Sequence, residues 1–293
     1  MKLSRGVSYM MASALGFSVM SVLVKVASQR LPTGEIVLAR AVVTLVISYA
    51  MVLRAGLHPW GTNKRGLVFR GVLGFGGLTF YYLAIAHLPL ADATTIQNTT
   101  PVLTAVLAWW ILRESIGWTT AFAIACGIGG VLLIVHPSGA GLDPLGVGVA
   151  LAAATTSAIA YVTVRQLART EHPLVIVFYF PLVATPLAVP WAVATWVTPQ
   201  PIDWLLLVAI GIATQVGQVF LTMGLALEKA GKATSVGYLQ VAFAMFWQWV
   251  VFDAPPTVWT IGGAMLIVAG TIAVASVRPR AAPAAGSPDR TAT

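Results

Sequence analysis

Long apolar stretches alternate with short polar or turn-rich segments along almost the whole chain. A hydrocarbon layer about 30 Å thick needs about 20 apolar residues in helical conformation. Stretches of that length predict ten membrane-spanning helices, joined by short connections that contain turn residues such as Pro32 and Gly34. They cover residues 6–27, 34–53, 68–86, 91–112, 117–135, 145–167, 173–197, 204–227, 233–252 and 258–277. The pattern therefore predicts an all-α integral membrane protein without a separate soluble domain.

The composition supports this fold class and excludes other classes of protein. Of the 293 residues, 58% are hydrophobic and 9% are charged, whereas an ordinary soluble domain carries about 25% charged residues. The net charge of +8 does not indicate a nucleic-acid partner, because the basic residues lie between apolar runs rather than in one patch. Cys126 is the single cysteine, which excludes an internal disulfide and a cysteine metal site. We expect the lipid bilayer as solvent, and neither a cofactor nor a metal.

Lysine and arginine indicate the orientation, because they concentrate in cytoplasmic loops. When the N-terminus is placed in the cytoplasm, most of the 17 basic residues, Arg70 among them, fall on the cytoplasmic side. Lys25, Arg30 and Arg40 are the exceptions. Arg40 lies about 9 Å of helical rise inside the second stretch, so we expect its side chain to snorkel to the outer surface. The sequence thus predicts a multi-pass protein of a bacterial inner membrane with both termini in the cytoplasm.

The chain reads as two copies of one five-helix unit. An ungapped offset of 140 residues aligns the first five stretches with the last five, and it pairs Lys25 with Arg165 and Gly77 with Gly217. We place the first repeat at residues 6–136, the second at 145–277, and a disordered cytoplasmic tail at 278–293. Because each unit has five helices, the second copy must be inverted in the membrane. Inverted repeats are common in transporters, with the substrate site near the membrane midplane.

Two motifs make a family resemblance specific. Residues 101–114, Pro-Val-Leu-Thr-Ala-Val-Leu-Ala-Trp-Trp-Ile-Leu-Arg-Glu, resemble the fourth helix of the EamA-type repeat of the drug/metabolite transporter superfamily. Residues 127–133 resemble its glycine-containing fifth helix, and Arg40 stands where such proteins often carry an arginine. In the second copy, Val241 and Ala254 replace the proline and the glutamate. The length and tryptophan content are similar to the YddG-like exporters of aromatic amino acids.

This resemblance implies an exporter of small metabolites that works by alternating access. It also implies that the third, fourth, eighth and ninth helices line a central cavity. As partners it implies a small-molecule substrate and the bilayer, with a monomer or loose dimer as the assembly.

Polar residues inside the predicted spans indicate where that cavity lies, since polar groups in hydrocarbon face a cavity or one another. They cluster at 94–101, where Pro101 permits a kink in the helix, and on one face of the eighth stretch. Single hydroxyl and aromatic side chains fit ordinary helix packing equally well, but the glutamines exceed what packing needs. The candidate substrate-binding residues are Tyr82, Thr94, Gln97, Asn98, Tyr161, Gln215, Gln218, Thr222, Tyr238, Gln240 and Trp247. Mixed aromatic and uncharged polar walls suit neutral and aromatic amino acids.

The residue types that the predicted spans lack limit the possible transport mechanisms and substrates. No Asp or Glu lies in the middle third of a predicted span, so a carboxylate proton relay is not indicated and we expect facilitated export. The alternative is a proton-coupled efflux pump for drugs or other metabolites such as nucleosides, with His87 as the titratable group. Without a cluster of buried Lys and Arg, we do not expect phosphorylated substrates. No nucleophile and base stand close together at mid-membrane, so an intramembrane enzyme is disfavoured, and the repeat favours a carrier over a channel.

Overall fold

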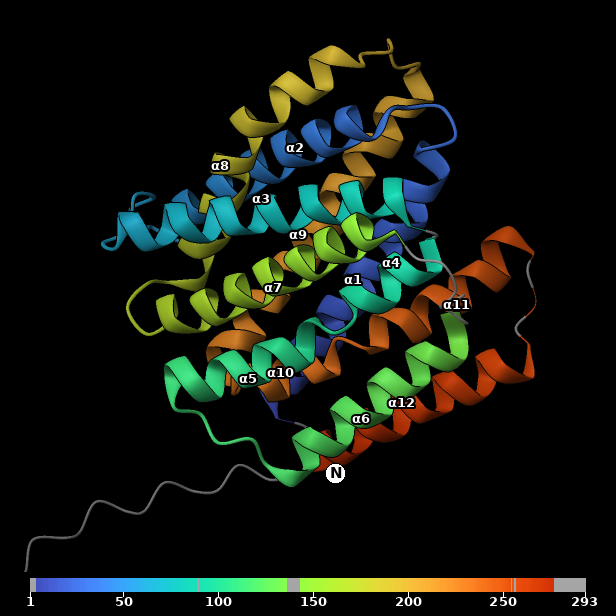
Figure 1. Ribbon diagram of the computed structural model, residues 1–293. Helices are drawn as coiled ribbons and strands as arrows, with labels where there is room; N and C mark the ends of the chain where they lie inside the picture. The colour runs from blue at the N-terminus through green and yellow to red at the C-terminus, as the bar shows by residue number, and fades with distance from the viewer. Residues whose placement is uncertain (1–3, 89, 136–142, 254, 256, 277–293) are drawn as a thin grey trace, which may run out of the picture.

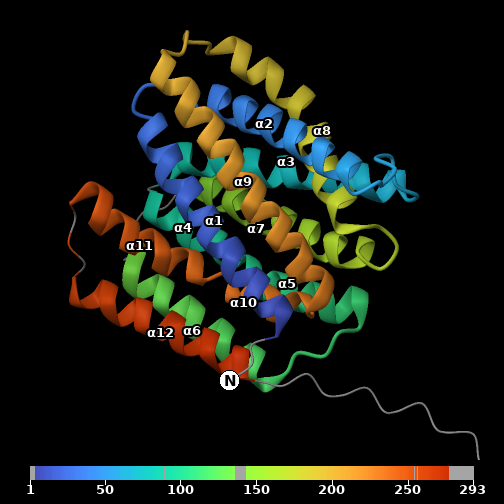
Figure 2. The same ribbon diagram turned by 180° about the vertical axis from the view of Figure 1, so that it is seen from behind.

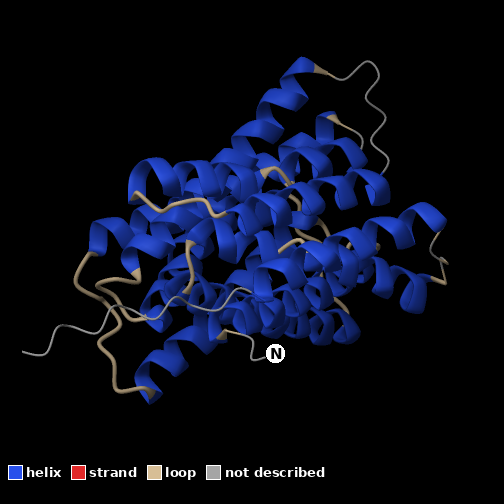
Figure 3. Ribbon diagram, turned by 90° about the horizontal axis from the view of Figure 1, so that it is seen from below, coloured by secondary structure: helices blue, strands red, loops and turns tan. Residues whose placement is uncertain are grey.

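The computed structural model describes residues 4–88, 90–135, 143–253, 255 and 257–276, in which every regular element is an α-helix (Figure 3). The helices are α1 Arg5–Ala27, α2 Thr33–Arg54, α3 Lys64–His87, α4 Leu90–Gln97, α5 Thr100–Leu112, α6 Trp118–Val135, α7 Pro144–Leu167, α8 Pro173–Ala194, α9 Pro201–Leu227, α10 Ala230–Val236, α11 Leu239–Phe252 and α12 Val258–Ser276. The predicted tail at 278–293 and Ala254 lie outside the described residues.

Eight of these helices are long and apolar enough to cross a membrane, namely α1, α2, α3, α6, α7, α8, α9 and α12. The other four form two consecutive pairs, α4 with α5 and α10 with α11, and two residues separate the members of each pair. Each pair takes the place of one predicted span. The pairs lie within the bundle (Figures 1 and 2), where α5 packs against α7 and α10, and α11 packs against α1.

The first interruption, at Asn98 and Thr99, follows from Pro101. This residue has no backbone N–H, so the carbonyl of Gln97 cannot receive a helical hydrogen bond from it. The hydroxyl of Thr100 donates to that carbonyl instead, at 2.6 Å. The kink that Pro101 predicts is therefore a complete break between two helices.

The second interruption, at Gly237 and Tyr238, forms without a proline. Gln240 donates its N–H to the carbonyl of Gly237 and Val241 to that of Tyr238, each at 2.9 Å, which is the tighter pattern of a 3₁₀ turn. Tyr238 stands 140 residues after Asn98, and its hydroxyl donates to the Asn98 carbonyl at 2.9 Å. The two breaks thus overlap at Asn98 and Tyr238 under the 140-residue offset, with the second break starting one residue earlier, and they are in direct contact.

Helices from the two halves of the chain pack in pairs, α1 with α9, α3 with α7, α2 with α8, and α6 with α12. Glycines permit the close crossings. A Cβ atom on Gly16 would lie 3.0 Å from the backbone nitrogen of Gly217, and one on Gly263 would lie 2.6 Å from the carbonyl oxygen of Gly130. The 140-residue offset turns the α1–α9 contact into the α3–α7 contact, so the packing has the same symmetry as the sequence repeat.

Polar contacts at the helix ends join segments that the orientation predicts on one side of the membrane. The contacts between segments predicted to be cytoplasmic are Ser4 with Glu228, Arg165 with Glu114, Lys229 with Ser115, and Thr62 with Glu171. Those between segments predicted to be external are Arg30 with Asp203, His87 with Asp143, and Val197 with Glu35. The bundle therefore has two polar ends, each held together by its own set of contacts.

Candidate functional site

A cavity of about 540 Å³, here called the broad lobe, lies beside the two helix breaks. Its wall includes Asn98, Gly237 and Tyr238 at the breaks themselves. It also includes Thr94 and Thr234, which are related by the 140-residue offset, as are Asn98 and Tyr238. A wall built from equivalent positions lies between the two halves, where transporters with internal repeats hold their substrates.

Most of the candidate residues lie around this cavity. Tyr82, Thr94, Gln97, Asn98, Tyr161, Tyr238 and Gln240 line the broad lobe, and Gln218 lines a smaller adjoining cavity. Aromatic and uncharged polar side chains are thus present in the wall of the broad lobe, together with the charged side chain of Arg40. That these side chains bind a substrate stays a prediction.

Three candidates are not among the residues that line either cavity. Gln215 and Thr222 are buried on α9, at 4% and 0% exposure, and the Gln215 amide lies 3.5 Å from Sδ of Met51. Trp247 donates its indole N–H to the hydroxyl of Ser18 at 3.1 Å. The sequence placed these residues on polar helix faces. In the structure those faces also contact neighbouring helices, and these three side chains pack between helices outside the lining of the two lobes.

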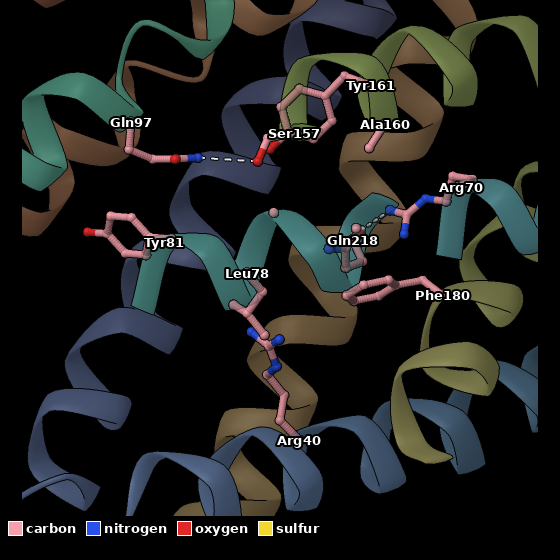
Figure 4. A pocket seen from close by; sticks show the side chains of 12 residues that line it. Arg40, Arg70, Leu78, Tyr81, Gln97, Ser157, Ala160, Tyr161, Phe180 and Gln218 are labelled. Atoms are coloured by element: carbon pink, nitrogen blue, oxygen red, sulfur yellow. Dashed lines mark hydrogen bonds between the residues drawn. The ribbon is translucent and has the colours of Figure 1, made fainter. Parts of the chain in front are cut away.

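The smaller cavity, here called the arginine lobe, has a volume of about 160 Å³. It shares Arg40, Leu78, Tyr81, Gln97 and Tyr161 with the wall of the broad lobe, so the two lobes adjoin. Figure 4 shows side chains from several helices converging on it. The remaining lining residues are Arg70, Gly74, Gly77, Ser157, Ala160, Phe180 and Gln218.

The position of Arg70 corrects the sequence interpretation. Helix α3 begins at Lys64, four residues before the predicted start, so Arg70 lies in the second turn of the helix and not at the cytoplasmic end of the span, where its charge was counted. Its side chain is only 3% exposed. The guanidinium lies 4.5 Å from the centre of the Phe180 ring and donates to Oε1 of Gln218 at 3.3 Å (Figure 4).

Arg40 also differs from the expectation. Rather than snorkelling to the outer surface, its side chain lines both lobes, with Nη1 3.9 Å from Sδ of Met20. Arg40 faces α1 from α2, and the side chain reaches inward along this face. The cavity therefore has two cationic residues that the sequence analysis assigned elsewhere.

Helix α1 supplies part of the wall that the predicted lining left out. Met10, Phe17 and Met20 add apolar surface to the broad lobe, and Ser21 adds a hydroxyl. The offset of 140 residues relates Ser21 to Tyr161, which is a candidate residue. Applying the repeat to every candidate would have located this face of α1.

Comparison with known proteins identifies the family. The sequence profile described as "EamA-like transporter family" matches twice, over residues 4–136 and 144–276. The chain belongs to this family. The two matched segments begin 140 residues apart, as the repeat requires. Membership shows that the protein is a multi-pass membrane transporter and not an enzyme.

Several relatives of this EamA-like transporter have been named. The pseudopaline exporter CntI of Pseudomonas aeruginosa is 34% identical over 277 residues, which cover 94% of this chain and 98% of the relative. The mouse solute carrier family 35 member G1 is 32% identical and covers 91% of this chain and 77% of that protein. The S-adenosylmethionine uptake transporter of Rickettsia prowazekii is 24% identical and covers 91% of both chains. None of these three is named as an amino-acid exporter of the YddG type, so the narrower resemblance is not supported.

A solved crystal structure has the same fold. It superposes with a TM-score of 0.78 at 20% identity, and the alignment covers 90% of this chain and 96% of the other. At this level of identity the match concerns the fold alone.

A hydrogen-bond network around Glu114 joins several helices at the end of the bundle that is predicted to be cytoplasmic. This carboxylate accepts a hydrogen bond from Nε of Arg165 at 2.9 Å and another from the backbone N–H of Ala230 at 2.8 Å. Arg165 also donates to the carbonyl of Ala226 at 2.6 Å. Glu114 and Arg165 thereby link the segment after α5 to α7, to the end of α9 and to the start of α10.

Proposed function

We propose that this transporter exports amino acids and related small metabolites by alternating access at the joined lobes. The observation that carries the proposal is the cavity beside two helix breaks, whose wall combines equivalent positions of both halves such as Asn98 and Tyr238. Broken helices expose polar backbone at membrane depth, which is tolerated where it lines a cavity. Two equivalent halves around one site support exchange between an inward-open and an outward-open state.

We infer ten membrane crossings, in which α4 with α5 and α10 with α11 each form one interrupted crossing. The two halves, at 6–136 and 145–277, are then inverted repeats, and both termini lie in the cytoplasm of a bacterial cell. The distribution of lysine and arginine supports this orientation. The grouping of end contacts into two sets, one with Glu114 and Glu171 and the other with Asp143 and Asp203, supports it as well.

The direction of transport and its energy coupling are supported by different observations. The Pseudomonas relative is named as an exporter, which supports outward transport, whereas the Rickettsia relative is named as an uptake transporter. Among the described residues that line the two lobes none is acidic, which supports facilitated rather than proton-coupled movement. His87 contacts Asp143 at 3.2 Å at the outer end, where both side chains are 41% exposed, and it is not in the walls of the lobes.

Transport in proteoliposomes tests the proposal. We expect labelled amino acids to show saturable, trans-stimulated flux that persists without an imposed pH gradient. Exchange of Gln218 or Tyr82 for Ala weakens this flux, because both side chains line the cavity. The control His87→Ala leaves it intact. Flux that collapses without the gradient and is lost in His87→Ala would establish the proton-coupled alternative instead.

A further inference from the structure

Two arginines reach the arginine lobe from different helices and from opposite ends of the bundle. Arg40 comes from the first half of α2 and Arg70 from the second turn of α3, and both line the same cavity of about 160 Å³. Figure 4 shows Arg40 rising from α2 toward Leu78 and Arg70 extending above Phe180 toward Gln218. Each lies about two helical turns inside its helix, which is roughly 10 Å of rise.

Neither Arg40 nor Arg70 has an acidic partner among the residues that the structure describes. The ion pairs found among the described residues involve Arg30, His87, Arg165 and Lys232. Arg70 has Phe180 and Gln218 as neighbours, and its Nε and Nη1 atoms are buried without a hydrogen-bond acceptor among the described residues. A cation buried in a membrane protein is costly unless it pairs, and such residues mark sites where ions or substrates bind.

The other polar groups of the arginine lobe are uncharged. Tyr81 and Tyr161 provide hydroxyl groups, and Gln97 provides an amide whose Nε2 donates to Oγ of Ser157 at 3.3 Å. Hydroxyl and amide donors bind carboxylate oxygens without adding charge, while guanidinium groups form the stronger charge-assisted bonds. The arginine lobe therefore combines the donors that a carboxylate needs with two positive charges.

The lobes differ in the part of a substrate that each can hold. The arginine lobe is small and polar, whereas the broad lobe has apolar wall from Met10, Phe17 and Met20. Arg40 belongs to both walls, so a molecule that spans the lobes passes this side chain. Such a division fits an organic acid whose carboxylates enter the arginine lobe while its remainder lies in the broad lobe.

We propose that Arg40 and Arg70 form an anion subsite for carboxylates, and that the transporter prefers metabolites that carry more than one carboxylate over neutral amino acids of the same shape. This inference rests on the proposed export through the same cavity and names its preferred class of substrate. With two guanidinium groups and no acidic residue among the described lining residues, a substrate of net negative charge leaves the fewest buried charges unbalanced.

Binding to the purified full-length protein in nanodiscs tests the subsite. Thermal stabilisation is titrated with glutamate and with glutamine, which have nearly the same shape and differ in one carboxylate. Tricarballylate serves as a larger polycarboxylate and phosphoserine as the phosphate probe. We expect glutamate to half-saturate at a concentration about tenfold below that of glutamine, since one charge-assisted contact separates them. Tricarballylate is expected to stabilise the protein as well.

Matched variants test whether the preference for glutamate over glutamine depends on the two cavity arginines. Arg40→Gln and Arg70→Gln are expected to abolish the preference for glutamate. Arg54→Gln and Arg65→Gln remove the same charge from exposed positions on the same two helices, and they are expected to keep it. A wild-type protein that responds equally to glutamate and glutamine, responds to neither, or responds more strongly to phosphoserine overturns the subsite, whatever the folding of the variants.

The flux and binding assays distinguish a failure of the anion subsite from a failure of the proposed export. Saturable leucine flux in proteoliposomes combined with no preference for the acid would leave export standing and remove the subsite. A clear preference for the acid in binding, without flux of any probe, would leave the subsite standing and remove export.

Discussion

Exchange of Glu114 for Gln is expected to loosen the contacts among α5, α7 and α10 at the predicted cytoplasmic end of the bundle. Glu114 accepts hydrogen bonds from Arg165 and from the backbone of Ala230, and the side chains of Glu114 and Arg165 are only 10% and 19% exposed. Glutamine keeps one acceptor oxygen but turns an amide donor toward one of the two N–H donors. The substitution also removes the charge that strengthens both bonds.

The size of the effect follows from these contacts. A hydrogen bond to a charged group contributes about 1.5–3 kcal/mol, and breaking a buried pair costs about 3–5 kcal/mol. Because the pair is partly exposed and one acceptor remains, we expect a loss of about 2 kcal/mol. This corresponds to about a thirtyfold increase in the population of the locally open state.

Hydrogen–deuterium exchange in nanodiscs measures this opening directly. Amides of α10 at Ala230 and beyond should exchange about thirtyfold faster in Glu114→Gln than in the wild type. The matched control is Asp143→Asn, which alters the exposed pair with His87 at the other end and should leave α10 unchanged. Unchanged hydrogen–deuterium exchange in α10 of Glu114→Gln would refute a local stabilising role for this network. Exchange that accelerates equally at both ends of the helix bundle would refute it as well.

Two further predictions concern stability. Gly263→Ala is expected to lower the free energy of unfolding by about 1–3 kcal/mol, because its Cβ would lie 2.6 Å from the carbonyl oxygen of Gly130. The control is Gly262→Ala, where the added Cβ meets open space, and this variant should melt at the same temperature as the wild type. Burial by itself raises the pKa of Glu171. Hydrogen bonds from the side chain and backbone of Thr62 and from the backbone of Asn63 together lower this pKa by more than burial raises it, so the net pKa lies below 4.5. The stability advantage of the wild type over Glu171→Gln should therefore be complete above about pH 4.5 and decline as pH falls through the lowered pKa. An advantage that stays constant across thermal melts from about pH 3 to 7 would contradict this assignment.

The sequence predicts the spans better than it predicts the cavity. Apolar length located the long helices, and Pro101 indicated the interruption between α4 and α5, because a missing N–H is visible in the sequence. The second interruption was not predicted, since Val241 has its N–H and the break forms through 3₁₀ hydrogen bonds around Gly237. A break of this kind depends on tertiary contacts such as the Tyr238–Asn98 bond, which only the folded chain shows.

The two cavity arginines show a different limit. Hydropathy placed Arg70 near the start of a span, whereas α3 begins at Lys64, so Arg70 lies a further turn inside the helix and is buried in the bundle. For Arg40, the distance from the helix end allowed either snorkelling or an inward orientation, and helix packing decides between them. The orientation of charged residues within two turns of a helix end is therefore decided by helix packing, which the folded structure shows.

Alternating access at the joined lobes can be tested most directly with a single cysteine in the cavity wall. Ala244 lines the broad lobe, and Cys126 is the one native cysteine, so Ala244→Cys in a Cys126→Ala background gives a unique reporter. A membrane-impermeant thiol reagent is applied to right-side-out and to inside-out vesicles. Reaction from both sides, slowed from each by a transported substrate and without ion conductance, is the predicted result. Reaction from one side only, or from both sides together with conductance, would contradict alternating access.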